Sequence, residues 1–214
     1  MGPARDVAGG SSPRRYESPL RARRADETRA SLIAAATELF TTQGWARTGM
    51  RQVATTAGVA VETLYSHFSS KRKLLDAVVD QAVVGDDAPI AVAERPEFAA
   101  IGTGSRTSRI AAATSLLTDV HRRTAPFAKL IREAATSDEE VAEVLRATRR
   151  RQRIDVQGAL GLILGRLPTE EELDATWAIV SPEVFLLLVE ESGWSLDRYE
   201  RWMTDTLGRL LPRR

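Results

Sequence analysis

The most specific combination of residue types and spacing lies between positions 44 and 75, which read GWARTGMRQVATTAGVAVETLYSHFSSKRKLL. A short helix capped by Thr48 would turn Val53 inward. Gly58 would then supply a left-handed turn, a backbone conformation that glycine adopts at little cost. A second helix is predicted to start near Val59. Helix, tight turn and helix in this order are typical of proteins that insert the second helix into the major groove of DNA.

The predicted second helix has many more outward than inward side chains. Val59, Leu64 and Phe68 recur at the spacing of one inward face. So many outward residues on so short a helix indicate a partner, which in a helix-turn-helix protein is a DNA duplex. The residues expected to face outward or onto a phosphate backbone are Ala60, Val61, Glu62, Thr63, Tyr65, Ser66 and His67.

Three consecutive cations, Lys71 to Lys73, follow at the start of another predicted helix, which Ser69 or Ser70 would cap. Cations are unfavourable at a helix N-terminus because the macrodipole is positive there. A phosphate that accepts hydrogen bonds from the free backbone N–H groups would reverse this cost. We therefore interpret the three cations as a phosphate-binding site beside the recognition helix.

Residues 29–78 resemble the DNA-binding domain of the TetR family of bacterial transcriptional regulators, over about a quarter of the chain. The family often has a small hydroxyl residue where Ala60 stands and a glycine or similar residue where Glu62 stands. The first difference weakens the helix cap, and the second alters base readout. The residues that fall in the family's order and spacing are Ile33 to Ala36, Leu39, Phe40, Gly44, Val53, Ala54, Ala57, Gly58, Val59, Thr63, Leu64, Tyr65, His67, Phe68, Lys71, Leu74 and Leu75.

The resemblance implies a homodimeric repressor whose two recognition helices enter successive major grooves of a palindromic operator in double-stranded DNA. Glu62 would accept from a cytosine amino group, and Val61 and Thr63 would touch a thymine methyl group. The family pattern implies phosphate contacts for Tyr65, His67 and Lys71. The full set expected to bind DNA is Thr48, Arg51, Ala60, Val61, Glu62, Thr63, Tyr65, Ser66, His67 and Lys71.

Composition excludes several classes of protein. The 214 residues are rich in Ala, Leu, Glu and Arg and show no strand-like alternation, which predicts an all-α fold. The absence of cysteine excludes disulfides, thiolate zinc sites and iron–sulfur clusters, and the two histidines lie far apart, so neither a metal nor a cofactor is expected. No apolar run approaches the roughly 20 residues of a membrane span, and the N-terminus lacks a signal-peptide core. A cytoplasmic location without a membrane partner is expected.

The net charge of +1 conceals an uneven distribution. Residues 1–24 carry a net charge of +4, residues 25–85 are balanced, and residues 86–214 carry −3. The segment 1–24 is either an arm that lies on the phosphate backbone or in the minor groove, or a solvated disordered tail. Its candidate DNA contacts are Arg14, Arg15, Arg21, Arg23 and Arg24.

The helical signals divide the chain into three parts. Residues 1–24 are the disordered basic arm, residues 25–85 a three-helix DNA-binding domain with its helix-turn-helix motif at about 49–69, and residues 86–214 a helical effector-binding and dimerisation domain. About nine helices are expected in all. Their predicted ranges are 25 or 26 to 44, two short helices within 49–69, 70–84, 105–123, 126–131, 138–165 after a capping box at Ser137, one from a capping box at Thr169, and 195–211, with a linker at 86–104.

The segment from Trp177 to Val189 is apolar on almost every side, and Pro182 should kink it. A helix that is apolar all round must be covered all round, either by a second copy of the chain or by the core of a monomer. The resemblance to TetR proteins favours the dimer. The residues expected at its interface are Trp177, Val180, Val184, Leu187, Leu188, Tyr199, Met203, Leu207 and Leu210.

Gly158, Gly161 and Gly165 lie in an apolar stretch of a predicted helix, where each costs about 1 kcal/mol relative to alanine. They indicate either a close approach of neighbouring helices or space for a small molecule. The resemblance implies an effector, of unknown identity, that binds this part of the chain and releases DNA. The residues expected to line its pocket are Phe98, Thr114, Leu116, His121, Phe127, Leu130, Asp155, Gln157 and Trp177.

An enzyme is not expected. The sequence has no Gly-rich phosphate loop, no histidine–carboxylate pair at useful spacing and no H-E-x-x-H motif. The acidic runs 138–140 and 170–172 suit helix N-termini rather than acid–base catalysis. The alternative to a regulator is an architectural DNA-binding protein without an effector, which would not need the acidic segment 86–214.

The arginines at 149–151 and 153 allow two interpretations. They form either a second nucleic-acid patch or a solvated helix face paired with acids, and we favour the second.

Overall fold

The computed structural model describes residues 19–85 and 96–211, and every regular element in these ranges is helical. The predicted all-α class is confirmed. The elements are α1 (Pro19–Arg47), α2 (Met50–Thr56), α3 (Val61–His67), α4 (Lys71–Val84), α5 (Pro96–Ala100), α6 (Arg106–Ala134), α7 (Glu139–Leu164), α8 (Glu170–Ile179), α9 (Pro182–Phe185), the π-helix η2 (Leu186–Glu191) and α10 (Leu196–Leu210).

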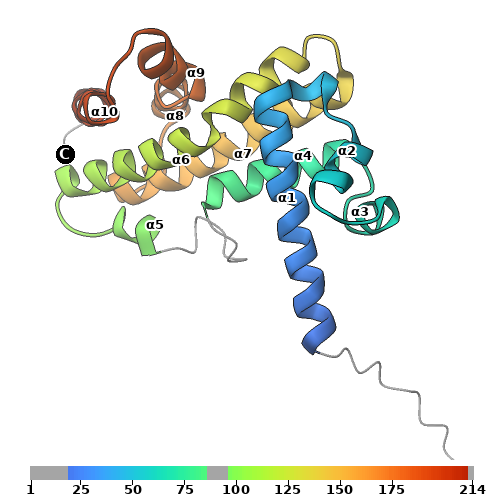
Figure 1. Cartoon of the computed structure of the whole chain (residues 1–214). Coiled ribbons are helices and arrows are strands. Elements are labelled where there is room, and N and C mark those ends of the chain that lie inside the picture. The colour runs from blue at the N-terminus through green and yellow to red at the C-terminus, as the bar shows by residue number, and fades with distance from the viewer. Residues whose placement is uncertain (1–18, 86–95, 212–214) are drawn as a thin grey trace, which may run out of the picture.

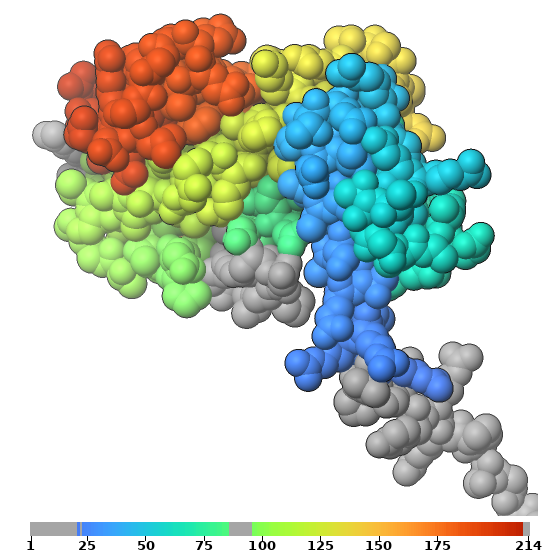
Figure 2. All heavy atoms as spheres, in the orientation of Figure 1, coloured from blue at the N-terminus to red at the C-terminus, as the bar shows by residue number. Residues whose placement is uncertain are grey.

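The long helices α6 and α7 run side by side through the middle of the molecule (Figure 1). Helices α1 to α4 gather around one end of this pair, and α8 to α10 lie at the other end. The space-filling view shows α2 and α3, in teal, protruding on the side opposite the orange α8–α10 region (Figure 2). The two ends joined by α6 and α7 are therefore well separated.

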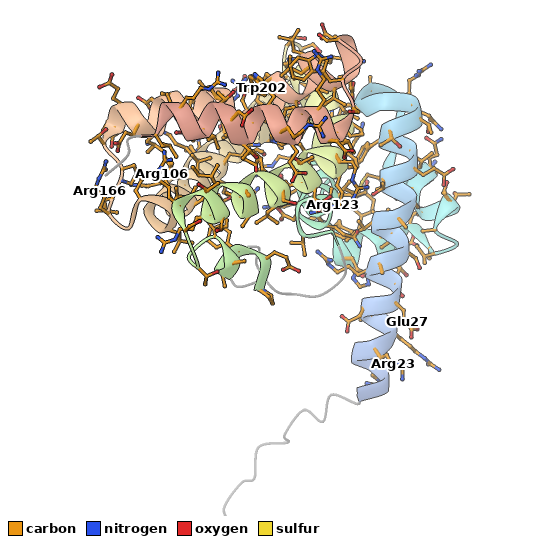
Figure 3. All side chains as sticks on the ribbon, turned by 90° about the vertical axis from the view of Figure 1, so that its left-hand side faces the viewer. Arg23, Glu27, Arg106, Arg123, Arg166 and Trp202 are labelled. Atoms are coloured by element: carbon orange, nitrogen blue, oxygen red, sulfur yellow. The ribbon has the colours of Figure 1, made fainter. Side chains whose placement is uncertain are left out.

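Helix α1 begins earlier than predicted. It starts at Pro19, so Arg21, Arg23 and Arg24 lie on its first turns rather than in an arm, and Arg14 and Arg15 lie outside the described residues. This part of α1 projects from the body, and Arg23 pairs with Glu27 at 3.7 Å on its surface (Figure 3). The predicted break is confirmed at Gly44, whose backbone leaves helical geometry at φ 78°.

Two hydrophobic cores hold the helices together. The first contains buried residues of α1 to α4, such as Leu32, Phe40 and Leu64, and extends into α6 and α7 through Phe127 and Val141. The second joins α6, α7, α8 and α10, and its largest fully buried side chain is that of Tyr199. The first core thus includes residues from the predicted DNA-binding domain, which ends at position 85, and residues from the part of the chain that follows it.

Two proline positions differ from the prediction. The chain runs as one helix through Pro126, where the sequence predicted two helices. Pro126 lies on the exposed side of α6. The backbone carbonyl that loses its helical hydrogen bond there can therefore bond to water. Pro182 does not kink a continuous helix, because α8 has ended at Ile179 and Pro182 occupies the first turn of α9.

The helix caps follow the sequence closely. Thr169 and Glu172 form the predicted capping box of α8, and Ser195 caps α10. The cap of α7 is Asp138 rather than Ser137, and its carboxylate accepts from the N–H groups of Glu140 and Val141. The predicted linker contains the short helix α5.

Arginines of α6 hold the ends of two other helices. Arg123 donates from Nε to the carbonyl of Ala82 at 2.9 Å and from a terminal nitrogen to that of Val83 at 3.0 Å, at the C-terminus of α4. Arg106 donates to the carbonyls of Gly208 and Leu211 at the end of α10 (Figure 3). These bonds satisfy carbonyls that have no partner within their own helices.

Among the described helices, none is long and apolar enough to cross a membrane.

Candidate nucleic-acid interface and effector cavity

Helices α2 and α3 and the turn between them have the predicted layout. Gly58 takes the left-handed conformation at φ 70°, and the N–H of Val59 donates to the carbonyl of Ala54 across the turn. Helix α3 begins at Val61, two residues later than predicted, and its N-cap Ala60 makes no side-chain bond. The weakened cap expected from alanine at this position is therefore present.

Thr48 does not cap α2, and its placement at the DNA surface was wrong. Its side chain is buried, and its hydroxyl donates to the carbonyls of Leu39 at 3.1 Å and Gly44 at 2.9 Å. Gly49 is the N-cap of α2. The hydroxyl of Thr48 donates its proton to carbonyls at the end of α1, so it has no proton left to donate to a phosphate.

The recognition helix α3 presents its polar side outward. Leu64 and Phe68 are buried against the first core, and Val59 is half-buried beside it. The side chain of Tyr65 is 51% exposed, which makes it one of the few large hydrophobic residues on the surface. Of the residues expected to bind DNA, Arg51, Ala60, Glu62, Tyr65 and Ser66 are exposed, and Val61, Thr63, His67 and Lys71 are half-buried.

Lys71 lies in a cluster with Trp45 and Asp138. Its ammonium donates to the carbonyl of Trp45 and lies 4.1 Å from the centre of the Trp45 ring. The indole N–H of Trp45 donates to Oδ2 of Asp138 at 2.7 Å. Burial lowers the pKa of Lys71, and the nearby Asp138 opposes this shift. The cluster connects the start of α4 to the start of α7.

The other cations of this helix start have different surroundings. Ser70 caps α4 as predicted, accepting from the N–H of Lys73 at 3.2 Å. Lys73 pairs with Asp76 at 3.8 Å. Within the described ranges, Arg72 has neither an ion pair nor a side-chain hydrogen bond. Internal partners therefore offset part of the charge that we had interpreted as a phosphate-binding site.

We expect Trp45→Phe to lower the free energy of unfolding by about 1.5 kcal/mol. This is the lower end of the range for hydrogen bonds to charged groups, and it applies because Asp138 is partly exposed. Phenylalanine keeps the stacking on Phe40, whose ring centre lies 5.8 Å away, but cannot donate to Asp138. Urea unfolding measures the loss. The control is Trp194→Phe, since the Trp194 indole nitrogen has no hydrogen bond among the described residues; equal losses for both variants would contradict the prediction.

A cavity of about 240 Å³ is lined by residues of α4 to α10. Its walls are mostly apolar, and α4 itself contributes Val79, Asp80 and Val83. Asp80 accepts from Arg151 of α7 at 2.8 Å on the cavity rim. The helix that carries Lys71 at one end therefore forms part of the cavity wall further along.

The structure brings together most of the residues predicted to line an effector pocket. Phe98, Leu116, His121, Phe127, Asp155 and Trp177 line the cavity. Three others do not: Thr114 shares a hydrogen bond of 2.7 Å with Thr204, Leu130 belongs to the first core, and Gln157 lies away from the cavity lining.

The glycines of α7 do not mark a close helix approach. A Cβ atom at Gly158 would lie 3.8 Å from Phe98, and one at Gly161 would lie 3.9 Å from the carbonyl oxygen of Arg166, both ordinary contacts. Gly165 ends α7 in the left-handed conformation at φ 67°.

Solved structures share this architecture over most of the chain. A member of the TetR family (SCO1917) from Streptomyces coelicolor aligns with a TM-score of 0.64 over 87% of this chain and 99% of its own, at 20% identity. NalD, named as the secondary repressor of the MexAB-OprM multidrug efflux pump in Pseudomonas aeruginosa, aligns with a TM-score of 0.54 over 89% and 98%, also at 20% identity. At these identities the likeness concerns the fold.

The DNA-binding region also matches in sequence. Residues 32–78 match the family model described as bacterial regulatory proteins, tetR family. The chain is 45% identical over 58 residues to the HTH-type transcriptional activator FasR of Mycolicibacterium smegmatis, covering 27% of this chain and 26% of that protein. It is 43% identical over 56 residues to the HTH-type transcriptional regulator TtgR of Pseudomonas putida, covering 26% and 27%. Residues 32–78 are therefore a DNA-binding domain of the TetR family. The curated matches span about a quarter of either relative.

The residues predicted to form a dimer interface fall into two groups. Val180, Tyr199, Met203 and Leu207 are buried inside the single chain, so their assignment to an interface was wrong. They belong to the second core, and hydrophobic periodicity alone does not distinguish a core residue from a residue of a subunit interface. Leu187 is 53% exposed and Leu210 37% exposed, while Trp177, Val184 and Leu188 are half-buried.

The arginine run at 149–153 is paired with acids, which confirms the second interpretation. Arg149 pairs with Glu183, Arg150 with Glu143 and Arg151 with Asp80, at 2.8 to 2.9 Å. Arg153 bonds to both Glu170 and Asp174. Across the described residues, no group of three or more acidic or histidine side chains is arranged to hold a metal ion.

Proposed function

We propose that the chain is a transcriptional repressor that binds a palindromic operator as a cytoplasmic homodimer and is released by a small molecule. The observation that carries the DNA-binding part is the surface of α3, where Tyr65, Glu62 and Ser66 point outward while Leu64 and Phe68 anchor the helix. The similarity of residues 32–78 to the TetR model supports the same assignment. In this proposal residues 25–85 bind DNA and residues 86–214 bind the effector and the second subunit.

The release mechanism rests on α4. Its first residue, Lys71, follows the end of the recognition helix at His67, and Val79, Asp80 and Val83 lie on the cavity wall. A ligand that binds better to one spacing of the two recognition helices shifts the dimer toward that spacing. Rotation of α4 as a rigid body would connect the two sites.

An architectural DNA-binding protein without an effector is the second candidate. The cavity argues against it, because an apolar space of this size next to α4 has no use in a protein that only binds or bends DNA. Enzymatic activity is not part of the proposal, since the named relatives are transcriptional regulators.

Selection of bound sequences from a random duplex pool at physiological salt tests the function. We expect recovery of one palindrome, because two recognition helices related by a dyad read two equivalent half-sites. Recovery of no sequence above background, from protein shown to be folded, would contradict sequence-specific binding.

Phosphate and base contacts should separate in mutants. Lys71→Ala is expected to weaken binding to all duplexes and to reduce the slope of log K against log salt by about 1. Glu62→Ala should chiefly relax base preference, at a cost of roughly 1 to 3 kcal/mol on the cognate site. Titrations on cognate and scrambled duplexes measure both. Equal losses on the two duplexes for both variants would contradict this division.

A further inference from the structure

Two hydroxyl groups on the cavity wall have no hydrogen-bond partner among the described residues. Oγ1 of Thr148 and Oγ1 of Thr176 are both buried without a partner, and Thr176 is only 3% exposed. Other buried threonines do not share this condition: Thr118 donates to the carbonyl of Thr114 at 2.8 Å, and Thr124 to that of Val120 at 2.9 Å. A helical threonine can satisfy itself in this way, so the two exceptions need an explanation.

The buried histidine of the cavity is uncharged at physiological pH. Burial lowers the pKa of His121 to about 4, against an opposing effect of Glu183. Nδ1 of His121 lies 3.1 Å from the hydroxyl of Tyr199, and burial raises the pKa of that phenol. The buried part of the cavity therefore offers hydrogen bonds and apolar contacts, but no charge to pair with a carboxylate or an ammonium group.

The charged residues of the cavity lie where water reaches them. Asp80 and Arg151 are each 55% exposed and already paired with one another. The side chain of Asp155 also reaches solvent, but burial against the cavity raises its pKa, and Arg151 acts in the opposite direction. Paired and hydrated charges contribute little to holding an ionic ligand.

We propose that this cavity selects a small, neutral, largely apolar molecule with one hydrogen-bonding group, such as a hydroxyl or carbonyl, that bonds to Thr148 and Thr176. The volume of about 240 Å³ lies just below the usual range for ligand pockets, which favours a small molecule. The inference deepens the proposed function, because it names the chemical class of the effector.

The test compares three probes that share one alkyl chain: 1-octanol, octanoate and octyltrimethylammonium. Calorimetric titration of the full-length protein should show 1-octanol binding at least about tenfold more tightly than either ion. Thr176→Val keeps the shape of the side chain and removes its hydroxyl. This variant should weaken the binding of 1-octanol about five- to tenfold. Thr118→Val is the matched control, because Thr118 is buried but does not line the cavity, and should change the affinity less than twofold.

Three results would overturn the inference: tighter binding of either ion, no loss of 1-octanol affinity in Thr176→Val, or binding of none of the three probes. Unchanged affinity in Thr176→Val would mean that water, and not the ligand, forms hydrogen bonds with these hydroxyl groups. The calorimetric titration measures ligand binding without DNA. Binding of 1-octanol as expected, with no effect on the selected duplex, would therefore support the ligand class and contradict the effector role.

Discussion

Lowering the pH from 6.5 to 4 is expected to reduce the free energy of unfolding by about 3 kcal/mol through His121 alone. The unfolded chain protonates this histidine near pH 6.5, whereas burial lowers its pKa in the folded chain to about 4. Between these values the unfolded state binds more protons, so stability is complete above pH 6.5 and falls as the pH is lowered.

The packing around His121 explains why it stays neutral. Its ring lies 5.4 Å from that of Phe185 and 6.2 Å from that of Tyr199, between centres, and it is buried. The facing charged group is Glu183, whose carboxylate already bonds to Arg149 at 2.8 Å. Within the part of the chain that the structure describes, no buried carboxylate is thus available to stabilise a protonated His121.

Urea unfolding at half-unit steps of pH measures the effect. His121→Gln keeps a hydrogen-bonding group but cannot titrate, so its stability should lack the part of the pH dependence that comes from His121. The comparison removes the contribution of the carboxylates, which both proteins share. Parallel curves for the two proteins would show that His121 is not the group responsible.

Leu187→Asp is expected to convert a dimer into a monomer and to weaken binding to the palindromic duplex by at least about 100-fold. Leu187 is 53% exposed in the single chain, in the segment that we propose as the subunit interface. A buried carboxylate at a two-fold interface occurs twice and repels itself. Loss of the second recognition helix removes the gain from linked binding, which is typically 10²- to 10⁴-fold.

Sedimentation velocity and a duplex titration measure these two effects. Leu167→Asp is the control, because Leu167 is 78% exposed but lies in the connection between α7 and α8. It should leave both mass and affinity unchanged. A dimeric Leu187→Asp variant would contradict the proposed interface, and circular dichroism shows whether the variant is folded.

The DNA-binding helices were predictable because their signals are local. Gly58 marks the turn, Ser70 marks a helix start, and Leu64 and Phe68 mark the inward side, each within a few residues of the feature it specifies. Thr48 was misplaced because its bond to the carbonyl of Leu39 spans a break in α1 that only the folded backbone creates.

The cavity was predictable only in part. Large apolar residues such as Phe98 and Trp177 mark a wall by type, but a threonine in a helix gives no sign of whether its hydroxyl will find a partner. The pair of Asp80 and Arg151 joins α4 and α7 across 71 positions, a separation that periodicity does not address. Tyr199 shows the same limit, since an apolar stripe predicts burial without naming what covers it.

Three side chains belong to both sites at once. Val79, Phe127 and Ile131 line the cavity and are also buried in the core that supports the recognition helix. A substitution that enlarges the cavity at any of them also loosens the support of α3. Evolution of a new ligand preference at these positions would thus carry a penalty in operator recognition. Ligand preference can change most freely at cavity residues outside that core, such as Leu116, Val156 and Trp177.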